Sequence, residues 1–169
     1  MSLLSFAKEV GEKLFRPIGQ ATAAPAQTTA AGSAPAANQA AQDVANGKTI
    51  ETYLTSLGLK VSGLKVAYNS ATFTASISGA AADQETREKA VVAAGNVQNV
   101  AKVDDQMTVT STGGAEAKYH TVEKGDTLSK IAKQVYGDAN QYNKIFEANK
   151  PMLKSADLIY PGQVLRIPA

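Results

Sequence analysis

The C-terminal segment, residues 119–169, carries turn and cap signals at spacings that allow only one order of secondary-structure elements. A β-rich stretch from Tyr119 to Val122 ends at Lys124-Gly125-Asp126, and apolar residues then recur at helical spacing up to Gly137. Asp126 or Thr127 is the expected N-cap of this helix, and Gly137 is its expected end.

A second helix and a closing strand are predicted in the same segment. The helix is expected to begin at Asp138 or Asn140 and to stop before Pro151. In Tyr160-Pro161-Gly162-Gln163, the proline presets one dihedral angle and the glycine supplies the positive φ of a type II turn. The apolar residues 164–167 then form a short strand. The predicted order is strand, helix, helix, strand.

These residues resemble a lysin-motif (LysM) domain, from Tyr-x-Thr-Val-x-x-Gly-Asp-Thr-Leu to Ile-Tyr-Pro-Gly-Gln-x-Leu-x-Ile-Pro. In that family, the turn after the first strand and the loop before the last strand form a shallow groove for glycans that contain N-acetylglucosamine. The resemblance implies a groove made by Gly125, Asp126, Thr127, Leu128, Asn149, Leu158, Ile159 and Tyr160. Structural roles explain several of these residues equally well, because Gly125 suits a turn, Asp126 a helix cap, and Leu128 and Ile159 a core.

A second pattern occupies residues 48–112. A helix with one apolar face is expected up to Gly58. A hairpin follows around a turn at Asn69-Ser70, with apolar and polar residues alternating along its two strands, and Asp83 caps a helix that ends at Gly95. A last strand takes Val103, Met107 and Val109. This helix-strand-strand-helix-strand order, with Gly-Asn-Val-x-x-Val-x-x-Val-Asp-Asp-Gln-Met-x-Val near its end, resembles a BON domain. Adjacent acids on a strand point to opposite faces and therefore make a poor pair of metal ligands. Asp104 and Asp105 are thus expected on the solvated surface.

The N-terminal residues 1–16 predict an amphipathic helix, because apolar residues form one stripe between charged ones. These charges interrupt the apolar run that a secretory signal needs, and no stretch approaches a membrane span. Residues 17–47 are dominated by Ala, Thr, Gln and Pro, which predicts a flexible linker, with a transient helix near residues 36–45 as the competing interpretation. We expect an α+β chain with two small domains, αββαβ (48–112) and βααβ (119–169), joined by a linker at 113–118.

Composition narrows the function classes. The chain has no cysteine, which excludes a disulfide-stapled scaffold and suits a cytoplasmic location. The net charge is +2 and no basic stripe is present, so nucleic-acid binding has little support. His120 is the only histidine, and the chain contains no Gly-x-Ser-x-Gly elbow, cysteine nucleophile or P-loop, so we expect a monomeric binding protein rather than an enzyme.

The combination of segments resembles a family of bacterial cytoplasmic potassium-binding proteins, in which a BON domain precedes a C-terminal LysM domain. The resemblance implies K⁺ binding by backbone carbonyls of Gly95, Val97 and Val100 with those of Ala7 and Val10, and compaction on binding, as in a sensor or buffer linked to osmotic or potassium stress. Carbonyl dipoles can replace the water shell of a weakly hydrated cation, and a helix C-terminus supplies such groups. A helix terminator at Gly95 and core packing of both valines explain the same residues without an ion.

Two alternative functions remain open from the sequence. The LysM resemblance alone favours a peptidoglycan-binding protein, which the absence of an export signal opposes. The third interpretation is an interaction module in which the LysM-like segment docks a protein partner.

Overall fold

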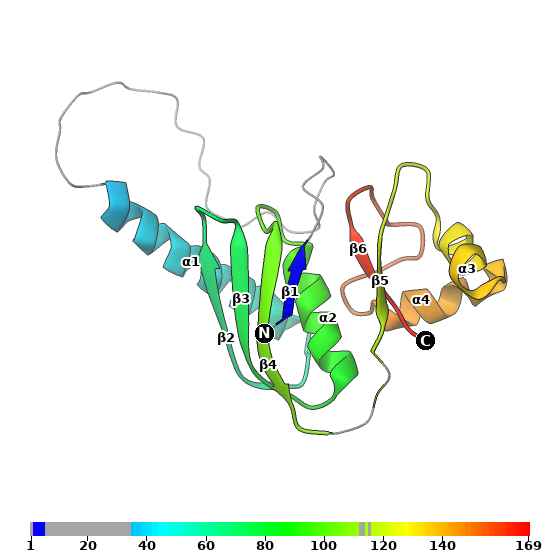
Figure 1. Cartoon of the computed structure of the whole chain (residues 1–169), viewed down its shortest axis with the longest axis horizontal. Helices are drawn as coiled ribbons and strands as arrows, with labels where there is room; N and C mark the ends of the chain where they lie inside the picture. The colour runs from blue at the N-terminus through cyan, green and yellow to red at the C-terminus, as the bar shows by residue number, and fades with distance from the viewer. Residues whose placement is uncertain (1, 6–34, 112–113, 115) are drawn as a thin grey trace.

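A computed structural model of the chain describes residues 2–5, 35–111, 114 and 116–169. These residues form two domains side by side, with helix α2 (Gln84–Gly95) lying between a four-stranded sheet and the C-terminal domain (Figure 1). Among the described residues, no helix has both the length and the apolar character that crossing a membrane requires.

The N-terminal domain is built on a sheet whose strand order is β1-β4-β3-β2. Strands β2 (Val61–Asn69) and β3 (Thr74–Ala81) form an antiparallel hairpin, and α2 then crosses over to β4 (Lys102–Val109), which runs parallel to β3. Helix α1 (Pro35–Ser56) packs mainly on β2, whereas α2 packs on β4 and β3. The order from α1 to β4 is therefore the expected αββαβ arrangement.

Alternation along the strands builds the core of this domain. One face of the sheet buries Val66, Ala75, Ile77, Val103 and Met107 against the buried faces of both helices, including Ile50, Leu54, Val91 and Ala94. The predicted helix face and the predicted strand alternation are thus confirmed. Phe73 lies in the hairpin turn with φ 51°, and β3 begins at the next residue.

The C-terminal domain has the predicted strand-helix-helix-strand order. Strand β5 (Lys118–Thr121) pairs antiparallel with β6 (Val164–Ile167), and α3 (Leu128–Tyr136), a 3₁₀ turn η1 (Ala139–Gln141) and α4 (Tyr142–Ala148) lie between them. Thr127 caps α3 by accepting a hydrogen bond from the Lys130 N–H, and Gly137 ends the helix with φ 79°. Gly162 has φ 83°, and the Gln163 N–H donates to the Tyr160 carbonyl, as the predicted type II turn requires.

The N-terminal helix predicted over residues 1–16 is wrong at its start. Residues Ser2–Ser5 form strand β1, which pairs antiparallel with β4 in a register that runs from Ser2 opposite Asp105 to Ser5 opposite Lys102. The edge of β4 offers backbone hydrogen-bond partners, which a prediction from helical periodicity does not take into account. In addition, four residues are too few for periodicity to separate helix from strand. The rest of the predicted helix, residues 6–16, lies outside the described residues.

The linker predicted over residues 17–47 is also wrong in its second half, where the competing interpretation of a helix near residues 36–45 holds, because α1 begins at Pro35. Alanine is the best helix former, and proline is accepted in the first turn of a helix. Tertiary contacts then hold this extension in place: the Asp43 carboxylate accepts a hydrogen bond from the Ser70 N–H at 3.2 Å, and Gln39 donates to the Ser70 hydroxyl. Residues 17–34 lie outside the described part of the chain.

Candidate functional site

The loop between α2 and β4, residues 96–101, begins at the C-terminus of a buried helix. Gly95 is the last residue of α2, and the following turn is closed by hydrogen bonds from Val97 N–H to the Ala94 carbonyl and from Val100 N–H to the Val97 carbonyl. The side chains of Val97 and Val100 are each 2% exposed and belong to the core. Val97 and Val100 can therefore contribute only their backbone groups to the polar chemistry of this turn.

A tyrosine from β2 holds the tip of the same loop. The Tyr68 hydroxyl donates to the carbonyl of Asn99 at 2.6 Å, and Asn99 has φ 67°, in the left-handed region. Burial raises the pKa of Tyr68, so its hydroxyl stays a donor throughout the neutral range. Beside this contact is a pocket of about 20 Å³, enough for one particle the size of a water molecule. Its lining residues are Asn46, Thr49, Ile50, Tyr68, Val97, Gln98 and Asn99.

Three of the five residues expected at an ion site, Gly95, Val97 and Val100, are brought together by this loop. Ala7 and Val10 lie outside the described residues. The last residue of β1, Ser5, is paired with Lys102, which follows Val100 by two positions. The chain therefore leaves β1 at the end of the sheet where the α2–β4 loop enters β4.

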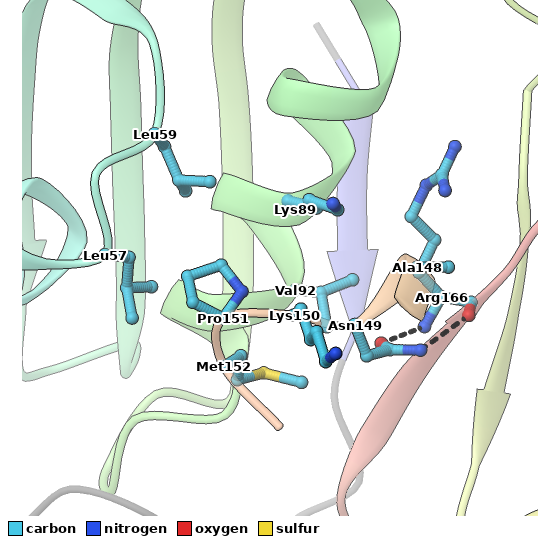
Figure 2. Close-up of a pocket in the computed structure, with 10 residues that line it drawn as sticks. All are labelled: Leu57, Leu59, Lys89, Val92, Ala148, Asn149, Lys150, Pro151, Met152 and Arg166. Carbon is cyan, nitrogen blue, oxygen red and sulfur yellow. Dashed lines mark hydrogen bonds between the residues drawn. The ribbon is translucent and has the colours of Figure 1, made fainter. Parts of the chain in front are cut away.

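Two asparagine side chains close the outer edge of β6. Asn96 donates from Nδ2 to the Val164 carbonyl and accepts at Oδ1 from the Val164 N–H, both at 2.8 Å. Asn149 makes the same pair of bonds, also at 2.8 Å, to the backbone of Arg166 (Figure 2). Each primary amide thus supplies the donor and the acceptor that the backbone of a neighbouring strand would otherwise supply. Asn96 does so from the N-terminal domain and Asn149 from within the C-terminal domain.

Glu88 forms the second polar connection between the domains. One carboxylate oxygen accepts from Arg166 Nε at 2.7 Å, and the other accepts from the Ala117 N–H at 3.1 Å and from Gln84 Nε2 at 2.8 Å. Glu88 is 3% exposed and Arg166 6%. A charge pair this deeply buried is satisfied only in the docked arrangement, so it favours one placement of the domains.

Apolar side chains make a further contact between the domains. Figure 2 shows Leu57, Leu59 and Val92 facing the 148–152 segment across a pocket of about 10 Å³. This volume is below what a ligand larger than water needs. The pocket is therefore a packing seam between the domains.

The groove residues expected from the LysM resemblance divide into two sets. The loop with Gly125, Asp126 and Thr127 and the loop with Leu158 to Tyr160 lie at the same end of the C-terminal domain (Figure 1), where Val122 bonds to the backbone of Gly162 and Gln163. Gly125, Thr127 and Leu158 are exposed, and Ile159 and Tyr160 are half-buried. Leu128 is buried in the core, and Asn149 is buried at the domain seam with its amide bonded to Ile145 and Arg166.

Asp126 is held by its own loop. Its carboxylate accepts from the Glu123 N–H at 3.0 Å and lies 3.1 Å from Nε2 of His120. The hydrogen bond from Glu123 and the nearby histidine lower the pKa of Asp126, so it is ionised at neutral pH. The predicted alternative, Thr127, is the residue that caps α3.

Sequence reasoning missed the residues that join the domains. Glu88, which lies between two basic residues of a helix, and Asp105, which was expected on the surface, are both buried. Asp105 pairs with Arg87 at 2.7 Å. The one available signal was Arg166, a charge between Leu165 and Ile167 in an apolar strand, which requires a buried partner.

Comparison with known proteins agrees with this architecture. A family model of the LysM domain matches residues 120–168. The potassium binding protein Kbp of Escherichia coli O6:H1 (strain CFT073) is 44% identical over 168 residues, which cover 99% of each chain. The chain belongs to the Kbp family.

Two shorter similarities each cover less than a third of this Kbp-family chain. An uncharacterized protein of Deinococcus radiodurans is 53% identical over 49 residues, 29% of this chain and 19% of that protein. The uncharacterized protein YqbP of Bacillus subtilis is 42% identical over 60 residues, 30% and 27% of the two chains. Among these three, the Kbp similarity is the one that covers nearly the whole chain.

Proposed function

We propose that this protein binds potassium through backbone carbonyls of Gly95, Val97 and Val100 together with those of Ala7 and Val10. The observation that carries the proposal is the similarity to a potassium binding protein along 99% of both chains. It includes the α2–β4 loop and the N-terminal segment, not the LysM domain alone.

The local geometry supports a cation at this loop. A large, weakly hydrated ion is held by several carbonyl dipoles that replace its water shell. The C-terminus of α2 places the negative end of a helix dipole at Gly95, and Val97 and Val100 follow within one turn. The Tyr68 hydroxyl fixes the direction of the Asn99 carbonyl and hence of the adjoining peptide groups.

The register of β1 supports the contribution of the N-terminal segment. Ala7 follows Ser5 by two residues, which span at most about 7 Å. Ser5 lies opposite Lys102, next to the loop that carries Val100. The segment after β1 and the α2–β4 loop therefore meet the sheet at the same end.

Binding of this kind converts ion concentration into stability of the closed form. A ligand that binds only the folded state adds RT ln(1 + [L]/Kd), about 2.7 kcal/mol at one hundred times Kd. We propose that the protein acts in the cytoplasm as a potassium sensor or buffer that becomes more compact on binding, in response to osmotic or potassium stress.

Thermal unfolding in KCl, NaCl and LiCl at matched ionic strength tests the proposal, because matched salt removes general screening. We expect a higher melting temperature in KCl only. The increase should shrink in a chain that lacks residues 1–16. Identical curves in the three salts would exclude potassium binding.

A pair of loop variants tests the location of the ion. Asn99→Val places a β-branched residue at a positive φ and should distort the loop, whereas Asn99→Gly accommodates that backbone. We expect the K⁺-specific increase in melting temperature to be lost in Asn99→Val and kept in Asn99→Gly. The comparison is between salts for each variant, so general destabilisation cancels. An unchanged increase in Asn99→Val would place the ion elsewhere.

The exposed loops of the LysM domain support a second candidate function, binding of glycans that contain N-acetylglucosamine. Leu158 is 61% exposed, and Gly125 and Thr127, in the other loop at the same end of the domain, are exposed as well. Titration with N-acetylglucosamine oligomers, followed by amide NMR shifts, should move the signals of these three residues. Shifts confined to other residues, or none at saturating glycan, would reject this groove and leave a protein partner as the remaining ligand of the LysM domain.

A further inference from the structure

We propose that Asn96 is the positioning residue through which the docked LysM domain sets potassium affinity. The inference rests on the proposed function, because it concerns the regulation of the same loop. It assigns to one side chain the connection between the ion-binding backbone and strand β6.

The main chain and the side chain of Asn96 have their hydrogen-bond partners in different domains. Its backbone lies between Gly95 and Val97, and its N–H donates to the carbonyls of Val92 and Ala94 at the end of α2. Its side chain leaves the loop and pairs with Val164, 68 residues later in the sequence. The residue is 2% exposed, so no solvent competes for these bonds.

Two bonds to one strand residue determine both the position and the orientation of the amide group. An asparagine side chain has only two rotatable bonds, so a fixed amide also restricts the peptide groups on either side of its α-carbon. Those peptides include the carbonyl of Gly95. Ligand groups must be held within about 0.5 Å of their productive positions, and this anchor limits such movement.

The other contacts between the domains do not explain such coupling. Glu88 and Arg166 hold the domains together, but Glu88 lies two helical turns before Gly95. Its carboxylate bonds to Gln84, Ala117 and Arg166. Asn149 makes the same two bonds to β6 without touching the loop. Asn96 is thus the side-chain contact that links β6 directly to the ion-binding turn.

Coupling of this kind is reciprocal. If the docked LysM domain raises potassium affinity through Asn96, bound potassium must favour docking by the same factor. Removal of the Asn96 amide should therefore weaken potassium binding and also make the domain arrangement insensitive to potassium.

Calorimetric titration with K⁺, with Na⁺ used to keep ionic strength constant, tests the first consequence on the full chain. Two hydrogen bonds of ordinary net strength are worth about a thirtyfold change in affinity, so we expect Asn96→Ala to bind K⁺ about thirtyfold more weakly. Asn149→Ala is the matched control, and its affinity should stay within about twofold. Folding of each variant is checked by NMR, and where alanine unfolds the domain, Asn96→Asp and Asn149→Asp repeat the comparison with side-chain volume kept.

A distance measurement tests the second consequence. The chain has no cysteine, so Thr52→Cys on α1 and Asn143→Cys on α4, both exposed, can carry a pair of spin labels. In the otherwise unchanged chain, saturating K⁺ should narrow the distance distribution. With Asn96→Ala added, saturating K⁺ should leave it unchanged, a result that local destabilisation alone does not produce.

The results separate the two proposals. Wild-type affinity in the Asn96 variants, or an equal loss in the Asn149 variants, would overturn the role of Asn96 while K⁺ binding itself stands. Absence of K⁺-specific heat in the unmodified chain would instead remove the proposed function, and with it the inference.

Discussion

Asp83, Thr127 and Asp138 each stand immediately before a helical segment, and each accepts a hydrogen bond from a backbone N–H in its first turn. Such caps depend on residues two or three positions apart, so sequence alone predicts them. Asp83 and Thr127 were both expected for this reason. Their contribution to stability can be measured one residue at a time.

At Asp83, we expect alanine to lower the free energy of unfolding by about 1 kcal/mol, because the Thr86 N–H loses its partner. Asparagine keeps an acceptor at the same place and should cost much less. Urea denaturation of both variants checks the difference. Equal losses would show that the carboxylate charge, rather than the hydrogen bond, carries the effect.

The same cap predicts a pH dependence. The hydrogen bond from Thr86 N–H lowers the pKa of Asp83 in the folded state, so its stabilisation is complete above the unfolded pKa of about 3.9 and is lost as pH falls through the folded pKa. We expect the stability advantage of wild type over Asp83→Asn to shrink in this acidic window. Urea midpoints from pH 6 to pH 2 measure it, and a constant difference would contradict the assignment.

Residues whose partners are distant in sequence were not predictable. Glu88 lies between Arg87 and Lys89 and reads as a solvated helix position, but its partner Arg166 is 78 residues away. Asp105 similarly depends on Arg87, 18 residues away. Periodicity identifies the face of an element, but it does not show which buried charges will find partners when two elements meet.

Among the elements, α1 shows how tertiary contact overrides a composition-based prediction. The helix crosses the outer edge of β2, where the Glu51 carboxylate accepts a bond from the Val66 N–H at 3.4 Å. Gly47 permits this approach, because a Cβ there would lie 2.6 Å from the Val66 carbonyl oxygen. The helix thereby covers the edge of the sheet that is exposed to strand pairing.

Helix propensity and packing make opposite predictions at Gly47. In an exposed helix, alanine is about 1 kcal/mol better than glycine. Here the clash is with backbone, so we expect Gly47→Ala to destabilise the fold by roughly 1–3 kcal/mol. Chemical denaturation decides between them, with the exposed Ala45→Gly as the propensity control in the same helix. Stabilisation by Gly47→Ala would mean that α1 does not lie this close to β2.

Across the whole molecule, the order of elements in each domain was predictable, because turns, caps and alternation are local. The docking of the domains was not. It depends on Asn96, Glu88 and Arg166, and nothing in the sequence near any one of them names the other two. The candidate ion site shows the same division. The helix end at Gly95 was predictable, whereas the pairing of Asn96 with Val164 was not.

The buried ion pair predicts how the domains unfold. Glu88→Ala leaves Arg166 buried without its main partner, so we expect a loss of about 3–5 kcal/mol and separate unfolding of the two domains. Glu85→Ala is the matched control, because Glu85 is exposed and lies 3.9 Å from Arg166. Calorimetry of the wild type and the control should show one transition. One transition in Glu88→Ala would mean that other contacts suffice to couple the domains.

The pairing of Asn96 with β6 also sets an order of events while the protein is being made. A ribosome adds about 5–20 residues per second, so the 68 residues between Asn96 and Val164 take roughly 3–14 seconds to synthesise. Once β4 has been made, the N-terminal domain has all its described strands and helices, but the amide of Asn96 has no strand to bind until β6 follows. In a newly made chain the loop between α2 and β4 is therefore anchored only after β6 has left the ribosome, later than the domain that contains the loop.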